Sequence, residues 1–305
     1  MAKVLSASEL ASRKASSLKR QSQGAEVWAR LRSRKIAMLS LGGIALILLI
    51  AIISDWIYPY NAWAIEQRAE LKLLKPFVDG AHWLGCDQLG RDMAARIFHG
   101  TRVALLIGIG ATFLALFLGT LLACICALYG GLADLVIMRI IDILSSVPHI
   151  IIALAICSGL GNGIWQLVTA ITIGGISIHT RMVRSVSISV AQMEYVESSI
   201  ALGGSPGHIM FKHLIPNIMS IIIIQGASNI AGNILQVATL SFIGLGIKPP
   251  RPEWGSMLNE GLTYMLRYPF MVFIPGIALV FTSLVINTFG DALRDAFDPQ
   301  LKGKA

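Results

Sequence analysis

The sequence contains little charge. Aspartate, glutamate, lysine and arginine make up 14% of its 305 residues, whereas soluble globular proteins carry about 25%. A water-facing surface on a chain of this length needs more charged groups, so the composition excludes a soluble enzyme. With 55% hydrophobic residues, the chain is also too apolar to be disordered.

Cysteine is scarce as well. The chain has four cysteines, and their spacing matches no metal-binding motif. Cys124, Cys126 and Cys157 lie in apolar stretches, where a thiol behaves as a small hydrophobic group. Cys86 lies apart from these three, so the sequence predicts neither a disulfide framework nor a metal centre.

Charge is missing above all from five stretches of at least 19 residues: 36–54, 103–133, 143–180, 214–247 and 268–290. A helix of about 20 residues crosses a hydrocarbon core of ~30 Å, whereas a transmembrane β-barrel would show alternating segments of ~10 residues. The third stretch has 38 residues and is predicted to divide at a glycine-rich turn, into helices 143–158 and 164–180. The sequence therefore predicts an all-α, polytopic membrane bundle of about six helices.

The distribution of basic residues predicts the orientation. Nine lysines and arginines and two glutamates precede the first apolar stretch, whereas residues 55–102, which follow it, carry six basic and six acidic residues. Because cytoplasmic segments are rich in Lys and Arg, both termini are placed in the cytoplasm. The net charge of +8 comes mostly from the N-terminal tail, so it indicates topology rather than nucleic-acid binding. The predicted order is a basic cytoplasmic tail (1–35), a first transmembrane helix (36–54), an extracytoplasmic loop (55–102), a transmembrane core (103–290) that includes a cytoplasmic loop (181–217), and a cytoplasmic tail (291–305).

The cytoplasmic loop 181–217 is predicted to contain two short helices. The first covers residues 194–202 and ends at a pair of glycines, and the second covers 205–214, begins with a Ser-Pro pair and ends before Pro216. A helix-turn-helix also occurs in DNA-binding proteins, but here the second helix offers only Lys212 and two histidines to a phosphate backbone. A pair of short helices is better suited to docking into a groove of a partner protein.

The residues of this loop carry a resemblance. Glu197, the small pair Ser198 and Ser199, Gly203 and finally Pro216 resemble the EAA loop of permease subunits of bacterial ABC importers. The sequence departs from that pattern in having the two serines where alanines are usual. The resemblance implies that this loop docks onto an ATPase subunit.

Three further segments resemble the oligopeptide, dipeptide and nickel group of these permeases. They are the external segment 82–92, with Cys86 where threonine is usual, the segment 240–255, and the tail 290–299, which is typical of the C-type permease of a pair. The resemblance extends over residues 30–301. It implies a MetI-like fold in a bacterial cytoplasmic (inner) membrane.

The resemblance also implies a set of partners. A homologous B-type permease would complete the pathway, two ATPase subunits would bind inside, an extracytoplasmic binding protein would deliver the solute, and lipid would surround the helices. The chain has no G-x-x-x-x-G-K-[ST] loop, so ATP chemistry is expected from the partners, and neither an enzymatic activity nor a cofactor is predicted. The expected cargo is a di- or oligopeptide or a related small solute. Nickel or a metal chelate carried by the same architecture is an alternative, and a stand-alone secondary transporter or channel is an alternative of another class.

Four amides recur in the apolar stretch 214–247, which is the fifth predicted membrane helix. Gln225, Asn229, Asn233 and Gln236 are spaced by four, four and three residues, which places them on one helical face. Amides are costly against lipid, so this face is expected to line a solute pathway or to join helices by hydrogen bonds.

Two other features of the sequence carry expectations. Asp87, Arg91 and Asp92 are expected either to form ion pairs in an external interfacial helix or to contact the binding protein. Pro148 is expected to bend the third membrane helix.

Overall fold

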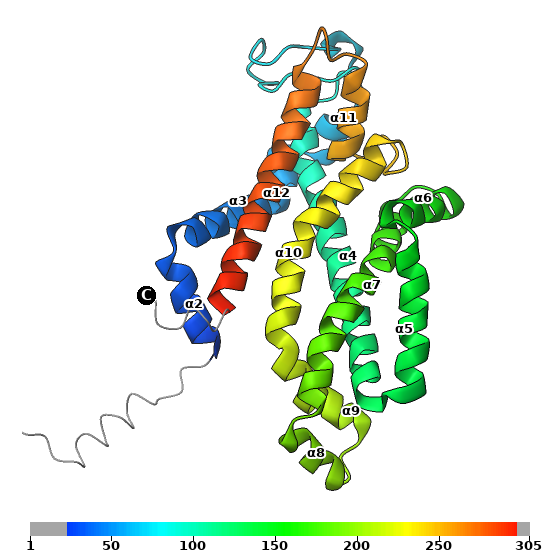
Figure 1. Cartoon of the computed structure of the whole chain (residues 1–305). Helices are drawn as coiled ribbons and strands as arrows, with labels where there is room; N and C mark the ends of the chain where they lie inside the picture. The colour runs from blue at the N-terminus through cyan, green and yellow to red at the C-terminus, as the bar shows by residue number, and fades with distance from the viewer. Residues whose placement is uncertain (1–22, 298–305) are drawn as a thin grey trace, which may run out of the picture.

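The computed structural model describes residues 23–297, and it is helical almost throughout (Figure 1). In chain order the elements are α2 (Gln23–Ser33), α3 (Lys35–Ile57), η1 (Tyr60–Ile65), η2 (Ala69–Leu71), α4 (Met93–Tyr129), α5 (Gly131–Ser146), α6 (His149–Leu160), α7 (Ile164–Ala191), α8 (Glu194–Ala201), α9 (Pro206–Ile209), η3 (Met210–Leu214), α10 (Ile215–Phe242), α11 (Trp254–Leu262) and α12 (Phe270–Phe297). This part of the chain contains no β-strand, only an isolated antiparallel bridge between Cys86 and Asp92.

The prediction of a helical membrane bundle is confirmed. Within residues 23–297, four helices are long and apolar enough to cross a membrane, namely α3, α4, the continuous helix Pro206–Phe242 and α12. The bent pair α5 and α6 makes a fifth if it is one span, so the count is lower than the predicted six. Although α7 has 28 residues, it is not in this set, because serine, threonine, histidine and arginine side chains are spread along it.

A sharp break separates α5 from α6, and the predicted single helix 143–158 is wrong at this point. The two helix axes differ by 85°. Val147, which ends α5, is extended at φ −100° and ψ 129°, as expected for a residue before a proline. Because Pro148 has no N–H and its ring collides with the preceding helical turn, the chain breaks here instead of bending gently.

The predicted helix end at Pro216 is also wrong. The chain passes from α9 through the π-helical turn η3 directly into α10, where Pro216 lies in the first turn. The N–H of Ile215 donates to the carbonyl oxygen of Met210, five residues earlier. This wider turn leaves room for the proline ring, so the helix continues.

Three more boundaries differ from the prediction. Helix α4 begins at Met93, inside the predicted external loop 55–102, because Asp92 caps it by accepting a hydrogen bond from the N–H of Ala95 at 2.7 Å. Residues 181–191 extend α7 instead of beginning a loop, and α12 continues to Phe297. Residues 298–305 of the predicted C-terminal tail, and 1–22 of the N-terminal tail, lie outside the described residues.

Helices α4 and α7 share the most extensive packing in the bundle. Gly119 of α4 lies so close to α7 that a Cβ atom there would be 2.9 Å from the Cβ of His179 and 3.1 Å from the backbone nitrogen of Thr180. Small residues at such contacts let membrane helices approach closely. The α4–α7 pair is therefore the central contact of the bundle.

The two ends carry different structures (Figure 1). The segment between α3 and α4, together with α11, lies at one end, and α8 and α9 lie at the opposite end. Helix α2 packs against the last turns of α12, where the guanidinium of Arg30 donates to the carbonyl oxygen of Ala296 at 3.1 Å. The candidate functional residues divide between these two ends and the interior of α10.

Candidate functional site

A tight turn joins α8 to α9. Gly203 has φ +82°, a left-handed conformation that costs a residue with a Cβ roughly 1–2 kcal/mol. The N–H of Gly204 donates to the carbonyl oxygen of Ser199 at 2.9 Å, and the hydroxyl of Ser205 caps α9 by accepting from the N–H of His208 at 3.3 Å. The sequence predicted this turn and cap, and the structure confirms both.

Buried side chains anchor the α8–α9 pair to the bundle. Val196 of α8 and Ile209 of α9 are buried in one cluster with Leu214, and with Val183 and Val190 of α7. The cluster also includes the end of α4 through Ala123 and Cys124. The pair is therefore packed against the ends of α4 and α7 through its buried side chains.

The outer side of this pair combines a carboxylate with apolar side chains. Glu197 is exposed, and so are Ile200 (54%), Leu202 (89%) and Phe211 (64%). This cluster, which we call the α8–α9 surface, is at the end of the molecule opposite α11 (Figure 1). Ile200 and Leu202 follow Glu197 by three and five residues, so exposed apolar side chains accompany the carboxylate at this short helix.

The structure brings most of the predicted loop residues together. Glu197, Ser198 and Gly203 are exposed on or beside the α8–α9 surface, and Ser199 is half-buried. Pro216 is exposed as well, but it lies in the first turn of α10 and acts as a helix residue, not as part of the turn.

The four amides of α10 differ in their bonding. The amide nitrogen of Asn233 donates to the hydroxyl of the buried Thr112 on α4 at 2.7 Å. Asn229 instead donates to the backbone carbonyl oxygen of Gln225 on its own helix, also at 2.7 Å. Asn233 thus joins two helices, whereas Asn229 has no such tie to another helix among the described residues. Gln225 is buried and Gln236 is half-buried.

A buried ion cluster occupies the other end of the molecule. Asp87 accepts from Nε of Arg91 at 2.7 Å and pairs with Arg96, and both arginines also reach Glu260 of α11 at 2.9 Å. Asp87, Arg91 and Arg96 are at most 1% exposed. We call these four residues the ion cluster, which ties the start of α4 to α11.

The arginines of the ion cluster change the pKa of Glu260. Burial alone would raise the pKa of Glu260, but the Arg96 and Arg91 guanidinium groups outweigh it and lower that pKa below its ordinary value of 4.5. The sequence indicated ion pairs for Asp87 and Arg91 within an external helix. The structure shows the ion pairs, but both residues lie in the non-helical segment before α4, so the expected helix is wrong. The prediction missed Arg96 and Glu260, although an arginine at the start of an apolar helix was a signal for a buried partner.

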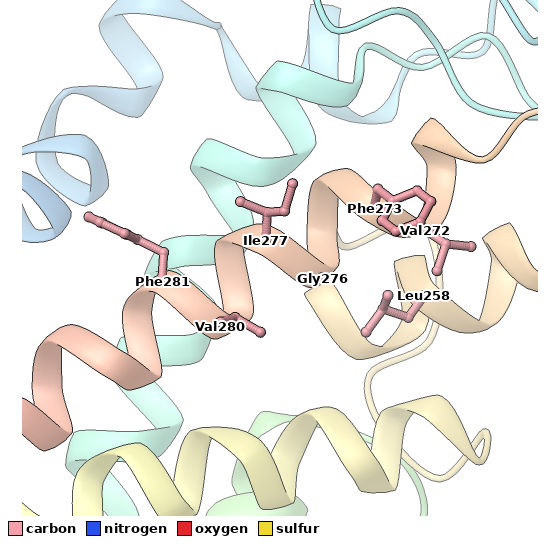
Figure 2. Close-up of a pocket in the computed structure, with 7 residues that line it drawn as sticks. All are labelled: Leu258, Val272, Phe273, Gly276, Ile277, Val280 and Phe281. Atoms are coloured by element: carbon pink, nitrogen blue, oxygen red, sulfur yellow. The ribbon is translucent and has the colours of Figure 1, made fainter.

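An open apolar hollow of about 480 Å³ runs along α12 (Figure 2). Its lining is Leu258, Val272, Phe273, Gly276, Ile277, Val280 and Phe281. None of these side chains carries a polar atom, so the hollow has no group that could orient a polar solute. The hollow offers apolar contacts alone.

Two family models match this chain. The model described as "Binding-protein-dependent transport system inner membrane component" matches residues 115–303, and the one described as "N-terminal TM domain of oligopeptide transport permease C" matches residues 22–76. Together they cover both the first membrane helix and the part of the chain that holds the α8–α9 surface.

Relatives over almost the whole chain share one name. The glutathione transport system permease protein GsiD of Pectobacterium atrosepticum is 37% identical over 277 residues, which are 91% of this chain and 91% of that protein. GsiD of Escherichia coli O157:H7 is 37% identical over 278 residues, with the same coverage of both chains. A solved chain of the MetNI methionine ABC transporter, in an inward-facing conformation, is similar with a TM-score of 0.54 at 18% identity and covers 68% of this chain and 98% of that chain. The likeness to the MetNI chain is one of fold.

Proposed function

We infer the function of this chain from a premise that the matches establish: it belongs to the family of binding-protein-dependent transport system inner membrane components. It is therefore a permease subunit of an ABC importer, a multi-span helical protein of the bacterial inner membrane. The family implies a partner permease, ATPase subunits and a binding protein. The cargo, the specific partners and the docking residues are the parts that we propose.

We propose that the α8–α9 surface receives one ATPase subunit. The observation that carries this proposal is the pair of short helices that is anchored by Val196 and Ile209 yet exposes Glu197 beside Ile200 and Leu202. A groove in the partner would cover the apolar side chains, and a donor in that groove would make a charge-assisted hydrogen bond to Glu197. Because the pair is packed onto α4 and α7, a movement of the ATPase would be transmitted to the membrane helices.

The proposed cargo is a short peptide, and glutathione is the leading candidate within this class. The support for it is the name shared by relatives that are 37% identical over 91% of the chain. A homologous B-type permease would enclose the other half of the pathway, and an extracytoplasmic binding protein would deliver the peptide. The two ATPase subunits would supply all of the hydrolysis, which agrees with a sequence that has no P-loop motif.

Reconstitution of the purified chain tests this assignment. Alone in liposomes it should show neither ATP hydrolysis nor flux of glutathione, a dipeptide or a nickel chelate, because half of the pathway and the motor are missing. Flux through the single chain would instead favour a channel or a secondary transporter. With its partner permease, ATPases and binding protein, ATP-dependent uptake should return, and the solute that is taken up identifies the cargo class.

Charge reversal at Glu197 tests the docking surface separately. Glu197→Lys should leave the chain in the membrane and abolish capture of the ATPase in a detergent pull-down. Glu70→Lys makes the same change at an exposed position of the opposite end, and it should leave capture intact. Equal capture by both variants would remove Glu197 from the docking surface.

A further inference from the structure

Three side chains of different chemistry converge where the external segment meets α4. They are His82, Cys86 and Asp92, whose ring nitrogen, sulfur and carboxylate oxygen all lie within 4.8 Å of one another. Their exposed fractions are 5%, 0% and 2%. The spacing in the sequence does not match a metal-binding motif, because the fold brings the three together through the bridge between Cys86 and Asp92.

We propose that His82, Cys86 and Asp92 bind one structural Zn²⁺ ion. Nitrogen, sulfur and oxygen from histidine, cysteine and aspartate are the ligand atoms that zinc takes in proteins, and three of them leave the fourth tetrahedral position to water. Cys86 supplies the only sulfur among the three ligands, so the proposal depends on this residue. A threonine hydroxyl is a far weaker ligand for zinc than a thiolate.

The three ligand atoms lie within 4.8 Å of one another, so they have to adjust to hold one ion. Nδ1 of His82 and one carboxylate oxygen of Asp92 are 2.8 Å apart, whereas two such ligands on a tetrahedral zinc are about 3.3 Å apart for bonds of ~2.0 Å. The ion would take the place of the hydrogen between these two atoms, and the neutral imidazole would carry its proton on Nε2 instead. The thiol proton of Cys86 would be released to solvent on binding.

Asp92 can serve the ion without losing its present role. One of its carboxylate oxygens caps α4 by accepting from the N–H of Ala95 at 2.7 Å, and the other faces His82. The indole ring of Trp63 lies 5.1 Å from the His82 ring, centroid to centroid, and covers one side of the cluster. The helix cap thus orients Asp92, and the indole of Trp63 packs beside His82. Groups that orient the ligands in this way support a metal site.

The charges balance as well. A thiolate and a carboxylate would neutralise a Zn²⁺ ion, and the nearby ion cluster of two arginines and two carboxylates is neutral by itself. The bound ion would link the turn at His82 to the first turn of α4. It would be a resident ion that stabilises the external end, which is independent of the cargo proposed above.

Cobalt is the probe for the site. The full chain, purified with a histidine-free affinity tag, treated with a chelator and then supplied with Co²⁺, should bind one ion and show a thiolate-to-cobalt charge-transfer band in the near ultraviolet. Cys86→Thr should remove the band and weaken Zn²⁺ binding by roughly 100-fold or more. Cys157→Ala, which replaces another buried free cysteine, should keep both. In a thermal melt, Zn²⁺ but not Mg²⁺ should raise the melting temperature of the unmodified chain and of Cys157→Ala.

Either of two outcomes of the cobalt experiment would overturn the site: the absence of a charge-transfer band in the unmodified chain, or an equal band in Cys86→Thr. If Cys86→Thr does not fold, X-ray absorption of the zinc-loaded unmodified chain decides the question. One sulfur among the zinc ligands supports the site, and a shell of nitrogen and oxygen alone contradicts it.

Discussion

Arg96, in the first turn of α4, is paired through its guanidinium with the Glu260 carboxylate of α11, at 2.9 Å and across 164 residues of sequence. Only 2% of the arginine side chain and 16% of the glutamate side chain are exposed. Glu260 also accepts from Arg91 and from the amide of Gln88, so one carboxylate of α11 joins three donors from the start of α4 and the segment before it.

Glu260→Gln should therefore destabilise the chain. It leaves two buried arginines with the single carboxylate of Asp87, and breaking a buried pair in this way costs about 3–5 kcal/mol. A large drop in the melting temperature of the purified chain in detergent would show it. Glu66→Gln removes the carboxylate of an ion pair with Arg68 in which the glutamate is 54% exposed, and it should change the melting temperature little.

Acid should weaken the same contact. The arginines lower the pKa of Glu260 in the folded chain below its ordinary value of 4.5, so the unfolded chain takes up the proton first. The stabilising contribution of the carboxylate is complete above pH 4.5 and is lost as the pH falls through the lowered pKa. Melting temperatures measured from pH 7 downward should consequently converge for the unmodified chain and Glu260→Gln, and a constant difference over that range would contradict the assignment.

Two glycines of the α8–α9 pair give a matched test of the turn. Gly203 has φ +82°, whereas Gly207 lies in α9 without a left-handed conformation, and a Cβ atom added there would have no other atom within 4 Å. Gly203→Ala should strain the turn by roughly 1–2 kcal/mol and reduce ATPase stimulation by the loaded binding protein in the reconstituted importer. Gly207→Ala should leave that stimulation unchanged, and equal effects of the two substitutions would show that the turn geometry is not needed for coupling.

The amide face of α10 should divide into two roles. Asn233→Leu removes the hydrogen bond to Thr112, which should cost about 0.6 kcal/mol and up to roughly 1.7 kcal/mol of stability. Asn229→Leu breaks only the two hydrogen bonds to Gln225 within its own helix, so assembly of the importer and its thermal stability should be unchanged. A loss of uptake in Asn229→Leu alone would support a lining role for this face.

Cysteine labelling tests the lining role independently. Single cysteines at Gln225, Asn229, Asn233 and Gln236 should react with a small water-soluble thiol reagent during turnover if the face meets the solute. The four native cysteines are all buried, so their background reaction should be low. Four unreactive positions throughout turnover would assign the face to helix packing.

The amino-acid sequence by itself determined the class of the protein and the turn between α8 and α9. Long uncharged stretches can be stable only where water is absent, so composition alone predicted the membrane bundle. The local rules for a left-handed glycine and a serine cap placed the α8–α9 turn at Gly203 and Ser205, because such a turn depends on neighbouring backbone atoms only.

Tertiary structure decided the features that depend on contacts between distant residues. Whether a proline ends a helix depends on the turn before it, so the sequence did not distinguish the break at Pro148 from the continuous helix through Pro216. The partner of Arg96 is 164 residues away, and nothing near it in the sequence points to Glu260. His82, Cys86 and Asp92 likewise meet only because an isolated bridge folds the external segment back on the start of α4. The energies of buried charges and of metal ligands depend on distances in space, and only the folded chain sets those distances.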